Sequence, residues 1–158
     1  MTVIAWDGKT LATDRMANDG SQKWESSKAW YSKRYKEGEC IITGVGLLSH
    51  IIQMKAWYIQ GGDVDSFRDL PCNRVAYSTS QLIVVRREGL YVFEGHHPVL
   101  RKEDFCAFGD GKEIAIGALA MGATAKQAVV ICNDFSLHCG KGVELFSLQG
   151  GKDAEEEC

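Results

Sequence analysis

The sequence of 158 residues lacks the features that mark secreted, membrane-spanning or linker-divided proteins. It holds two prolines, Pro71 and Pro98, so no proline-rich linker separates domains. No apolar run approaches the roughly 20 residues that span a bilayer, and the first residues have neither the basic nor the apolar part of a signal peptide. We therefore expect one cytoplasmic domain over residues 1–149, with the small and charged segment 150–158 as a flexible tail.

An excess of positive charge and paired metal ligands are missing as well. The formal net charge is −3, which argues against a general nucleic-acid binder. The basic and aromatic run 33–36 could bind nucleic acid, but its strand-like alternation favours a solvated sheet edge. The six cysteines form no C-x-x-C pair, so we expect reduced thiols rather than a zinc site. The sequence predicts no metal and no cofactor.

Short alternating runs joined by glycine turns indicate antiparallel strands through much of the chain. Asp7-Gly8 and Glu88-Gly89 are typical hairpin turns, and each stands between two such runs. The sequence predicts strands at residues 2–6, 9–14, 27–35, 39–45, 81–87, 90–94, 99–102, 105–108 and 143–148.

Helical spacing of apolar residues predicts helices over residues 47–60, 110–121 and 124–133. Gly61-Gly62 and Gly122 supply stops for the first two. Asp110 is a candidate cap for the second helix, and Thr124 with Gln127 fits a capping box for the third. The order of strands and helices favours the α+β class, with antiparallel sheets covered by helices.

The position of Thr2, directly after the initiator methionine, is the feature that most strongly indicates a catalytic group. Removal of Met1 would make Thr2 the first residue, with a hydroxyl nucleophile and an α-amine that can take its proton. The α-amine suits this work because its reference pKa of about 7.7–8.0 leaves a neutral fraction near neutral pH. A threonine chosen only for its strand propensity is the plainer alternative.

Three further features could complete a site around Thr2. The hairpin at Asp7-Gly8 brings Asp14 within a pairing step or two of Thr2. Lys28 could place a positive charge near the hydroxyl and favour its deprotonated form. The turn Gly44-Val45-Gly46, between a strand and a helix, offers backbone N–H groups to a developing oxyanion.

Taken in order, these residues resemble the proteasome β-subunit family. The resemblance rests on Thr2, Asp14, Lys28, Gly44-Val45-Gly46 and the later stretch Phe108-Gly109-Asp110-Gly111, which precedes a helix. It covers residues 2–148 and is nearest to HslV-like peptidases and to proteasome-like proteins of phages and prophages.

This resemblance implies an N-terminal-nucleophile (Ntn) hydrolase fold, a four-layer αββα sandwich of two antiparallel sheets between helix layers. It also implies a threonine-type peptidase that cleaves peptides or proteins inside a homo-oligomeric ring. In that picture Thr2 attacks, Lys28 tunes its acidity, Asp14 holds Lys28, and the Gly46 N–H stabilises the oxyanion. The chain has no ATP-binding G-x-x-x-x-G-K-[ST] loop, so an unfoldase would be a separate protein. The implied location is the cytoplasm of a bacterium or a phage-infected host.

Two positions depart from the pattern of this family. Asp110 stands where the family usually has a serine beside the amine of the nucleophile, and a carboxylate there would raise the pKa of that amine. Ser136 stands where relatives carry an aspartate in a supporting turn. Two alternatives therefore stay open. One is a catalytically inactive scaffold or host-factor-binding protein of the same fold, and the other is an amidase that acts on a small amide.

Overall fold

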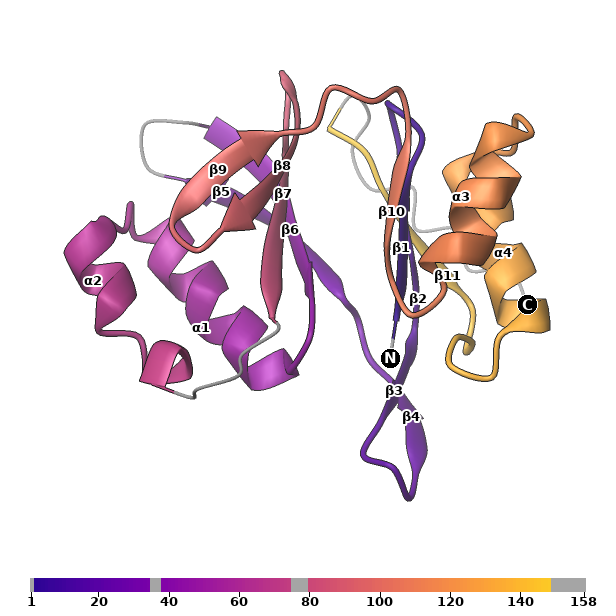
Figure 1. Cartoon of the computed structure of the whole chain (residues 1–158), viewed down its shortest axis with the longest axis horizontal. Helices are drawn as coiled ribbons and strands as arrows, with labels where there is room; N and C mark the ends of the chain where they lie inside the picture. Colours follow the sequence, from indigo (N-terminus) through magenta and orange to yellow (C-terminus); the bar gives the residue numbers. More distant parts are fainter. Residues whose placement is uncertain (1, 35–37, 75–79, 149–158) are drawn as a thin grey trace. The chain divides into compact units, whose positions relative to one another are not determined.

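The computed structural model describes residues 2–34, 38–74 and 80–148 (Figure 1). The chain divides into two compact units. The first contains the described residues up to Lys28 and from Glu103 onward, and the second extends from Ala29 to Lys102. Met1 and segment 150–158 lie outside the described residues, so the single domain over 1–149 and its tail stay predictions.

Four antiparallel strands form the sheet of the first unit, in the order β10-β1-β2-β11. Their bounds are Cys106–Gly109 for β10, Val3–Trp6 for β1, Leu11–Asp14 for β2 and Val143–Phe146 for β11. Helices α3 (Lys112–Ala120) and α4 (Ala125–Phe135) pack against this sheet on one side (Figure 1). The core between them consists of small and branched apolar side chains, among them Val3, Ala5, Ala12, Ala115, Leu119, Ala128 and Val129.

The hairpin between β1 and β2 forms at the predicted Asp7-Gly8 turn. One carboxylate oxygen of Asp7 accepts the backbone N–H groups of Lys9 and Thr10, at 3.1 and 2.8 Å. Gly8 has a φ of 90°, which glycine adopts without a steric penalty. The other oxygen of Asp7 accepts the N–H of Ala125 at 2.9 Å, which anchors the start of α4 to the hairpin.

The two helices of this unit begin in different ways. Thr124 and Gln127 form the predicted capping box of α4, with backbone-to-side-chain bonds of 3.2 and 2.9 Å. The prediction that Asp110 caps α3 is wrong, because Gly111 is the N-cap residue. The N–H of Gly111 donates to the carbonyl oxygen of Thr2 at 3.3 Å. The turn before α3 therefore lies next to Thr2.

A two-stranded ribbon and two short helices were not predicted. Strands β3 (Met16–Asn18) and β4 (Lys23–Glu25) pair with each other after the end of β2. Helices α2 (Val64–Arg68) and η1 (Pro71–Arg74) follow the first long helix of the second unit. These segments are too short to show a clear hydrophobic period.

The second unit contains a sheet of five antiparallel strands in the order β5-β6-β7-β8-β9. Their bounds are Ala29–Arg34 for β5, Gly38–Val45 for β6, Gln81–Arg86 for β7, Gly89–Glu94 for β8 and His97–Leu100 for β9. Helix α1 (Leu48–Ile59) packs on β5, β6 and β7. Edge-to-face contacts among Trp57, Tyr58, Phe67 and Phe93 fill the space between helix and sheet.

All nine predicted strands are confirmed, with ends that shift by at most two residues. Strand β5 is an edge strand, as the run 33–36 predicts for its described part, while Tyr35 and Lys36 lie outside the described residues. Arg34 lies over the ring of Tyr58, with 4.3 Å between the guanidinium carbon and the ring centroid. The basic side chain therefore has a structural contact in this unit.

Within the described ranges, no helix is long and apolar enough to cross a membrane. In the same part of the chain, no group of three or more metal-binding side chains is clustered. Five cysteines of the described residues are buried thiols, namely Cys40, Cys72, Cys106, Cys132 and Cys139.

Candidate active site

The candidate site of the first unit is built around the carboxylate of Asp14, whose side chain is completely buried. One of its oxygens, Oδ1, accepts the Thr2 hydroxyl at 3.0 Å, the Val3 N–H at 3.0 Å and the Lys28 ammonium at 2.7 Å. The other oxygen accepts the N–H groups of Met16 and Gly140, both at 3.3 Å. Five donors therefore satisfy a charge that would be costly to bury alone.

The hairpin register explains why Asp14 meets Thr2. Ile4 pairs with Thr13 in the β1–β2 ladder, so the next step along both strands brings the end of β2 to the start of β1. The sequence predicts this proximity from the hairpin at Asp7-Gly8, whichever register the turn imposes, and the 3.0 Å bond between the Thr2 hydroxyl and Asp14 confirms it. Lys28 lies just before β5 rather than within the strand, and its side chain reaches Asp14 from there.

Lys28 is a largely buried ammonium held beside a nucleophile candidate. Its side chain is 11% exposed. Burial lowers the pKa of Lys28 below its ordinary value of 10.5, and the charge of Asp14 and its hydrogen bond oppose this shift, with smaller contributions from Cys139 and Asp110. Since Lys28 and Thr2 share one oxygen of Asp14, a positive charge lies close to the hydroxyl that would have to lose its proton.

The backbone of Thr2 is in contact with the turn that precedes α3. The side chain of Thr2 is buried, and its carbonyl oxygen accepts the Gly111 N–H. A Cβ at Gly109 would collide with the Thr2 carbonyl oxygen, and Gly109 has a φ of 89° that favours glycine. A Cβ at Gly111 would lie 2.9 Å from the Cys139 sulfur. Both glycines are therefore required where they stand.

Asp110 lies between these two glycines and is exposed. Its charge acts on both Lys28 and Cys139, which places the carboxylate in the electrostatic surroundings of the Asp14–Lys28 pair. Its predicted role beside the amine of Thr2 stays a prediction.

Gly46 belongs to the second unit, and its predicted role as an oxyanion donor also stays a prediction. It directly follows the last residue of β6, Val45, has a φ of 113° and lies in the turn into α1. The neighbouring Leu47 N–H donates to the hydroxyl of Ser80 at 3.1 Å.

The turn after α4, which the resemblance to the proteasome family names through Ser136, belongs to this site through contacts that the sequence did not predict. The Gly140 N–H of that turn bonds Asp14, and the Cys139 thiol packs against Gly111. Burial raises the pKa of Cys139, and burial also raises the pKa of Cys132 to about 12, so both thiols favour the protonated form near neutral pH. Backbone donors leave no signal in a sequence, although the glycine at position 140 could have pointed to a tight approach.

Ser136 begins the same turn. Its hydroxyl accepts the His138 N–H at 3.2 Å, and its carbonyl accepts the Cys139 N–H at 3.4 Å. Ser136 therefore shapes the loop that brings the Gly140 N–H to Asp14.

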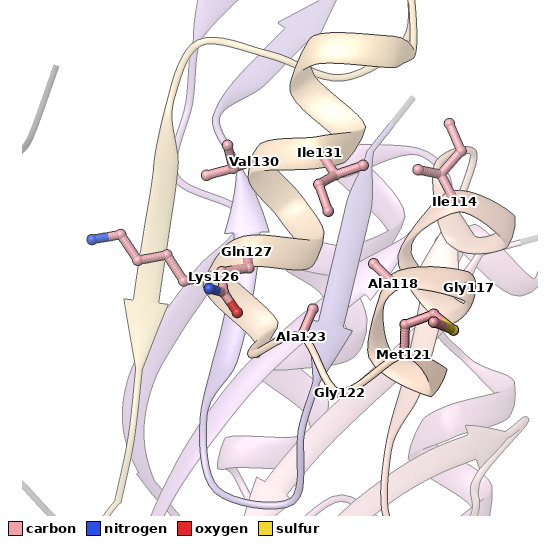
Figure 2. Close-up of a pocket in the computed structure, with 10 residues that line it drawn as sticks. All are labelled: Ile114, Gly117, Ala118, Met121, Gly122, Ala123, Lys126, Gln127, Val130 and Ile131. Carbon is pink, nitrogen blue, oxygen red and sulfur yellow. The ribbon is translucent and has the colours of Figure 1, made fainter.

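A separate groove of about 790 Å³ lies on the helices of the first unit, and Figure 2 shows its lining. The residues that line it come from α3, α4 and the turn between them, and most are apolar: Ile114, Gly117, Ala118, Met121, Gly122, Ala123, Lys126, Gln127, Val130 and Ile131. It contains none of the residues around Asp14 and is therefore a different surface from the candidate site.

Comparison with known proteins finds similarity at the level of structure. No family model and no curated protein sequence matches the chain. Among solved structures, Thiobacillus denitrificans BPH in complex with epoxomicin has a TM-score of 0.61 and 16% identity, covering 92% of this chain and 96% of its own. Eukaryotic HslV from Trypanosoma brucei has a TM-score of 0.57 and 17% identity, with 92% and 97% covered.

A third solved structure agrees with these two. The Gly-1 mutant of Anbu from Hyphomicrobium sp. strain MC1 has a TM-score of 0.68 and 13% identity, covering 93% of this chain and 82% of its own. Identities this low indicate a shared fold and do not establish a shared activity. The chain thus has an HslV-like and proteasome-like α+β fold of antiparallel sheets and helices.

Proposed function

We propose that this protein is a threonine-type peptidase whose nucleophile is Thr2. Thr2 becomes the N-terminal residue when Met1 is removed. The observation that supports the proposal most is the shared oxygen of Asp14, which accepts both the Thr2 hydroxyl and the Lys28 ammonium. If Asp14 and Lys28 served only the stability of the fold, the lysine would not need to lie beside the Thr2 hydroxyl. Met1 lies outside the described residues, so its removal belongs to the proposal.

The reaction begins with attack of the Thr2 hydroxyl oxygen on the carbonyl carbon of a peptide bond. The free α-amine of Thr2 takes the hydroxyl proton and passes it to the leaving amine as the C–N bond breaks, which leaves an acyl-threonine ester. Water then attacks the ester, releases the acid product and restores the hydroxyl. Lys28 favours the deprotonated oxygen, and Asp14 keeps the ammonium in position.

Gly46 and Asp110 have supporting roles in this proposal. The Gly46 N–H donates to the oxyanion that forms in both steps, where a preorganised donor stabilises the transition state. Asp110 accepts a hydrogen bond from the α-amine of Thr2. Because a carboxylate stabilises the ammonium form, it shifts the working range of the amine to higher pH.

We also propose that the peptidase works as a homo-oligomeric ring in the cytoplasm of a bacterium or a phage-infected host, with proteins unfolded by a separate ATP-dependent partner as substrates. One solved structure of similar fold is described as a helical assembly of the Anbu complex from Pseudomonas aeruginosa. The groove between α3 and α4 supports an interface with a second copy, because its lining is mostly apolar and its Met121 is 88% exposed. Met121→Asp should lower the mass measured by light scattering, whereas Val64→Asp on α2 should not. A monomeric wild type would contradict the ring.

A catalytically inactive scaffold or host-factor-binding protein is the second candidate. The observation in its favour is the pair of exchanged residues, Asp110 and Ser136, which alter the surroundings of the nucleophile. An amidase for small amides differs from a peptidase only in the substrate it turns over.

The deciding experiment is hydrolysis of fluorogenic peptides by protein with a free N-terminus, with any tag placed at the C-terminus. Thr2→Ala should abolish turnover, and Thr10→Ala, in the turn between β1 and β2, should retain it. Activity in Thr2→Ala would overturn the proposal. A wild type that turns over neither peptides nor small acyl amides would favour the scaffold, and turnover of small amides alone would favour the amidase.

A further inference from the structure

The turn from β6 into α1 has no side chain of its own that restrains its backbone through a hydrogen bond at the N-cap. Leu47 occupies the N-cap position of α1 and has no side-chain oxygen to accept a backbone N–H. Gly46, just before it, has a φ of 113° and the wide conformational freedom of glycine. Gly46 therefore adds little local resistance to a rotation of the peptide plane between these two residues.

Ser80 supplies the missing restraint from a neighbouring strand. The ladder of β6 and β7 ends where Val45 pairs with Gln81, so Ser80 stands opposite Gly46, one step beyond the last pair. There its hydroxyl accepts the Leu47 N–H at 3.1 Å. A side chain thus continues the ladder where backbone pairing stops.

His50 holds the Ser80 hydroxyl in turn. The Nδ1 atom of His50 lies 3.3 Å from the Ser80 oxygen, and the His50 residue is 7% exposed in the first turn of α1. In the imidazole tautomer that carries its proton on Nε2, Ser80 donates to Nδ1 while it accepts from Leu47. The His50 backbone N–H donates to the Leu47 carbonyl at 3.0 Å. His50 therefore contacts the Ser80 hydroxyl with its ring and Leu47 with its backbone.

The close packing at Gly46 shows that Ser80 fits this position tightly. A Cβ added at Gly46 would lie 2.6 Å from the Ser80 Cα and would also collide with its hydroxyl. The glycine and the serine therefore depend on each other. A larger residue at 46 would push Ser80 away and break its bond to Leu47.

We propose that Ser80, oriented by His50, is a positioning residue that locks the Gly46–Leu47 peptide against rotation. The peptide group is planar and trans, so fixing the Leu47 N–H toward Ser80 also fixes the Gly46 carbonyl on the opposite side. A rotation would reverse this dipole next to the Gly46 N–H, which is the donor expected to bind the oxyanion. This inference rests on the proposed peptidase function, because only there does the orientation of the Gly46 N–H affect a rate.

The first test measures the lock without reference to catalysis. Hydrogen exchange of the Leu47 amide should be at least several-fold faster in Ser80→Ala than in wild type. The matched control is Ser49→Ala, which removes an exposed hydroxyl from the same first turn of α1 and should leave the Leu47 exchange unchanged. Equal exchange in Ser80→Ala and wild type would overturn the proposal.

The second test measures the effect on the reaction. Loss of one hydrogen bond corresponds to a change of up to about tenfold, so kcat for peptide hydrolysis should fall about 3- to 10-fold in Ser80→Ala with KM unchanged. His50→Asn keeps a polar atom near the place of Nδ1 and should retain more of kcat than His50→Ala. Thermal unfolding of each variant identifies any that fails to fold, and Ser80→Thr then tests rescue by a retained hydroxyl.

The outcomes separate this inference from the proposed function. If Thr2→Ala abolishes turnover and Ser80→Ala exchanges faster at Leu47 but keeps its kcat, the positioning role is overturned and the peptidase stands. If Thr2→Ala keeps its activity, or the wild type has none, the peptidase and the catalytic part of this inference both fall. The exchange measurement then still decides whether Ser80 locks the turn.

Discussion

Replacement of Asp14 by alanine is the perturbation that tests the candidate site most severely. It removes the acceptor of five hydrogen bonds and leaves the ammonium of Lys28, with an 11% exposed side chain, without its carboxylate partner. Removing one partner of a buried ion pair costs about 3–5 kcal/mol because the remaining charge is not compensated. Small domains are stable by about 5–15 kcal/mol, so the loss would be a large part of the total.

The opposite replacement, Lys28→Met, should cost less. Asp14 would keep four donors, namely the Thr2 hydroxyl and the N–H groups of Val3, Met16 and Gly140. We expect a loss of about 1.5–3 kcal/mol, the scale of one hydrogen bond to a charged group. In the double variant the ammonium that has lost Asp14 is absent, so the loss of the double variant should be about 2 kcal/mol smaller than the sum of the two single losses.

Urea unfolding of the wild type, both single variants and the double variant measures this coupling. Asp104→Ala, which removes an exposed carboxylate from the same unit, is the control and should change the free energy of unfolding by less than about 0.5 kcal/mol. Losses that add within about 0.5 kcal/mol would refute the coupling of Asp14 and Lys28. If Asp14→Ala does not fold, Asp14→Asn takes its place in the cycle.

Three further predictions concern charge, thiol reactivity and capping. Because burial lowers the pKa of Lys28 below 10.5, the unfolded chain binds more protons than the folded one between the folded pKa and 10.5. The free energy of unfolding of the wild type should therefore rise with pH across that window relative to Lys28→Met, and a difference that is flat or falls with pH would contradict the lowered pKa. Burial raises the pKa of Cys132 to about 12, so alkylation at pH 8 followed by peptide mapping should find Cys132 labelled far more slowly in the native protein than in urea; equal rates would contradict its burial. Thr124→Ala removes the cap of α4 and should lower the free energy of unfolding by about 1 kcal/mol, while Thr124→Ser should stay close to wild type, and equal losses in the two variants would show that the hydroxyl does not act as a cap.

The parts of the fold that could be predicted are those where local chemistry decides the backbone. Asp7-Gly8 forms its hairpin because an aspartate side chain and a positive φ are both needed at adjacent positions. The capping box of Thr124 and Gln127 is local in the same way. Asp110 does not cap α3, because the helix begins after Gly111, whose N–H donates to the carbonyl of Thr2, more than a hundred residues away.

The candidate site could be predicted in part for the same reason. The meeting of Thr2 and Asp14 follows from one turn, so the sequence was sufficient. The bonds from Gly140 to Asp14 and from Leu47 to Ser80 depend on where distant segments meet. A backbone N–H is present at almost every residue, so its use as a donor cannot be read from a side-chain pattern.

The central claim is that an unblocked Thr2 hydroxyl is the reactive nucleophile. The most direct test is mass spectrometry of protein made in a bacterial cytoplasm and treated with an electrophilic proteasome inhibitor, with peptide mapping of any adduct. We expect a protein that has lost its initiator methionine and carries one inhibitor molecule on Thr2, with no adduct in Thr2→Ala. A protein that retains Met1 and stays unmodified would contradict it.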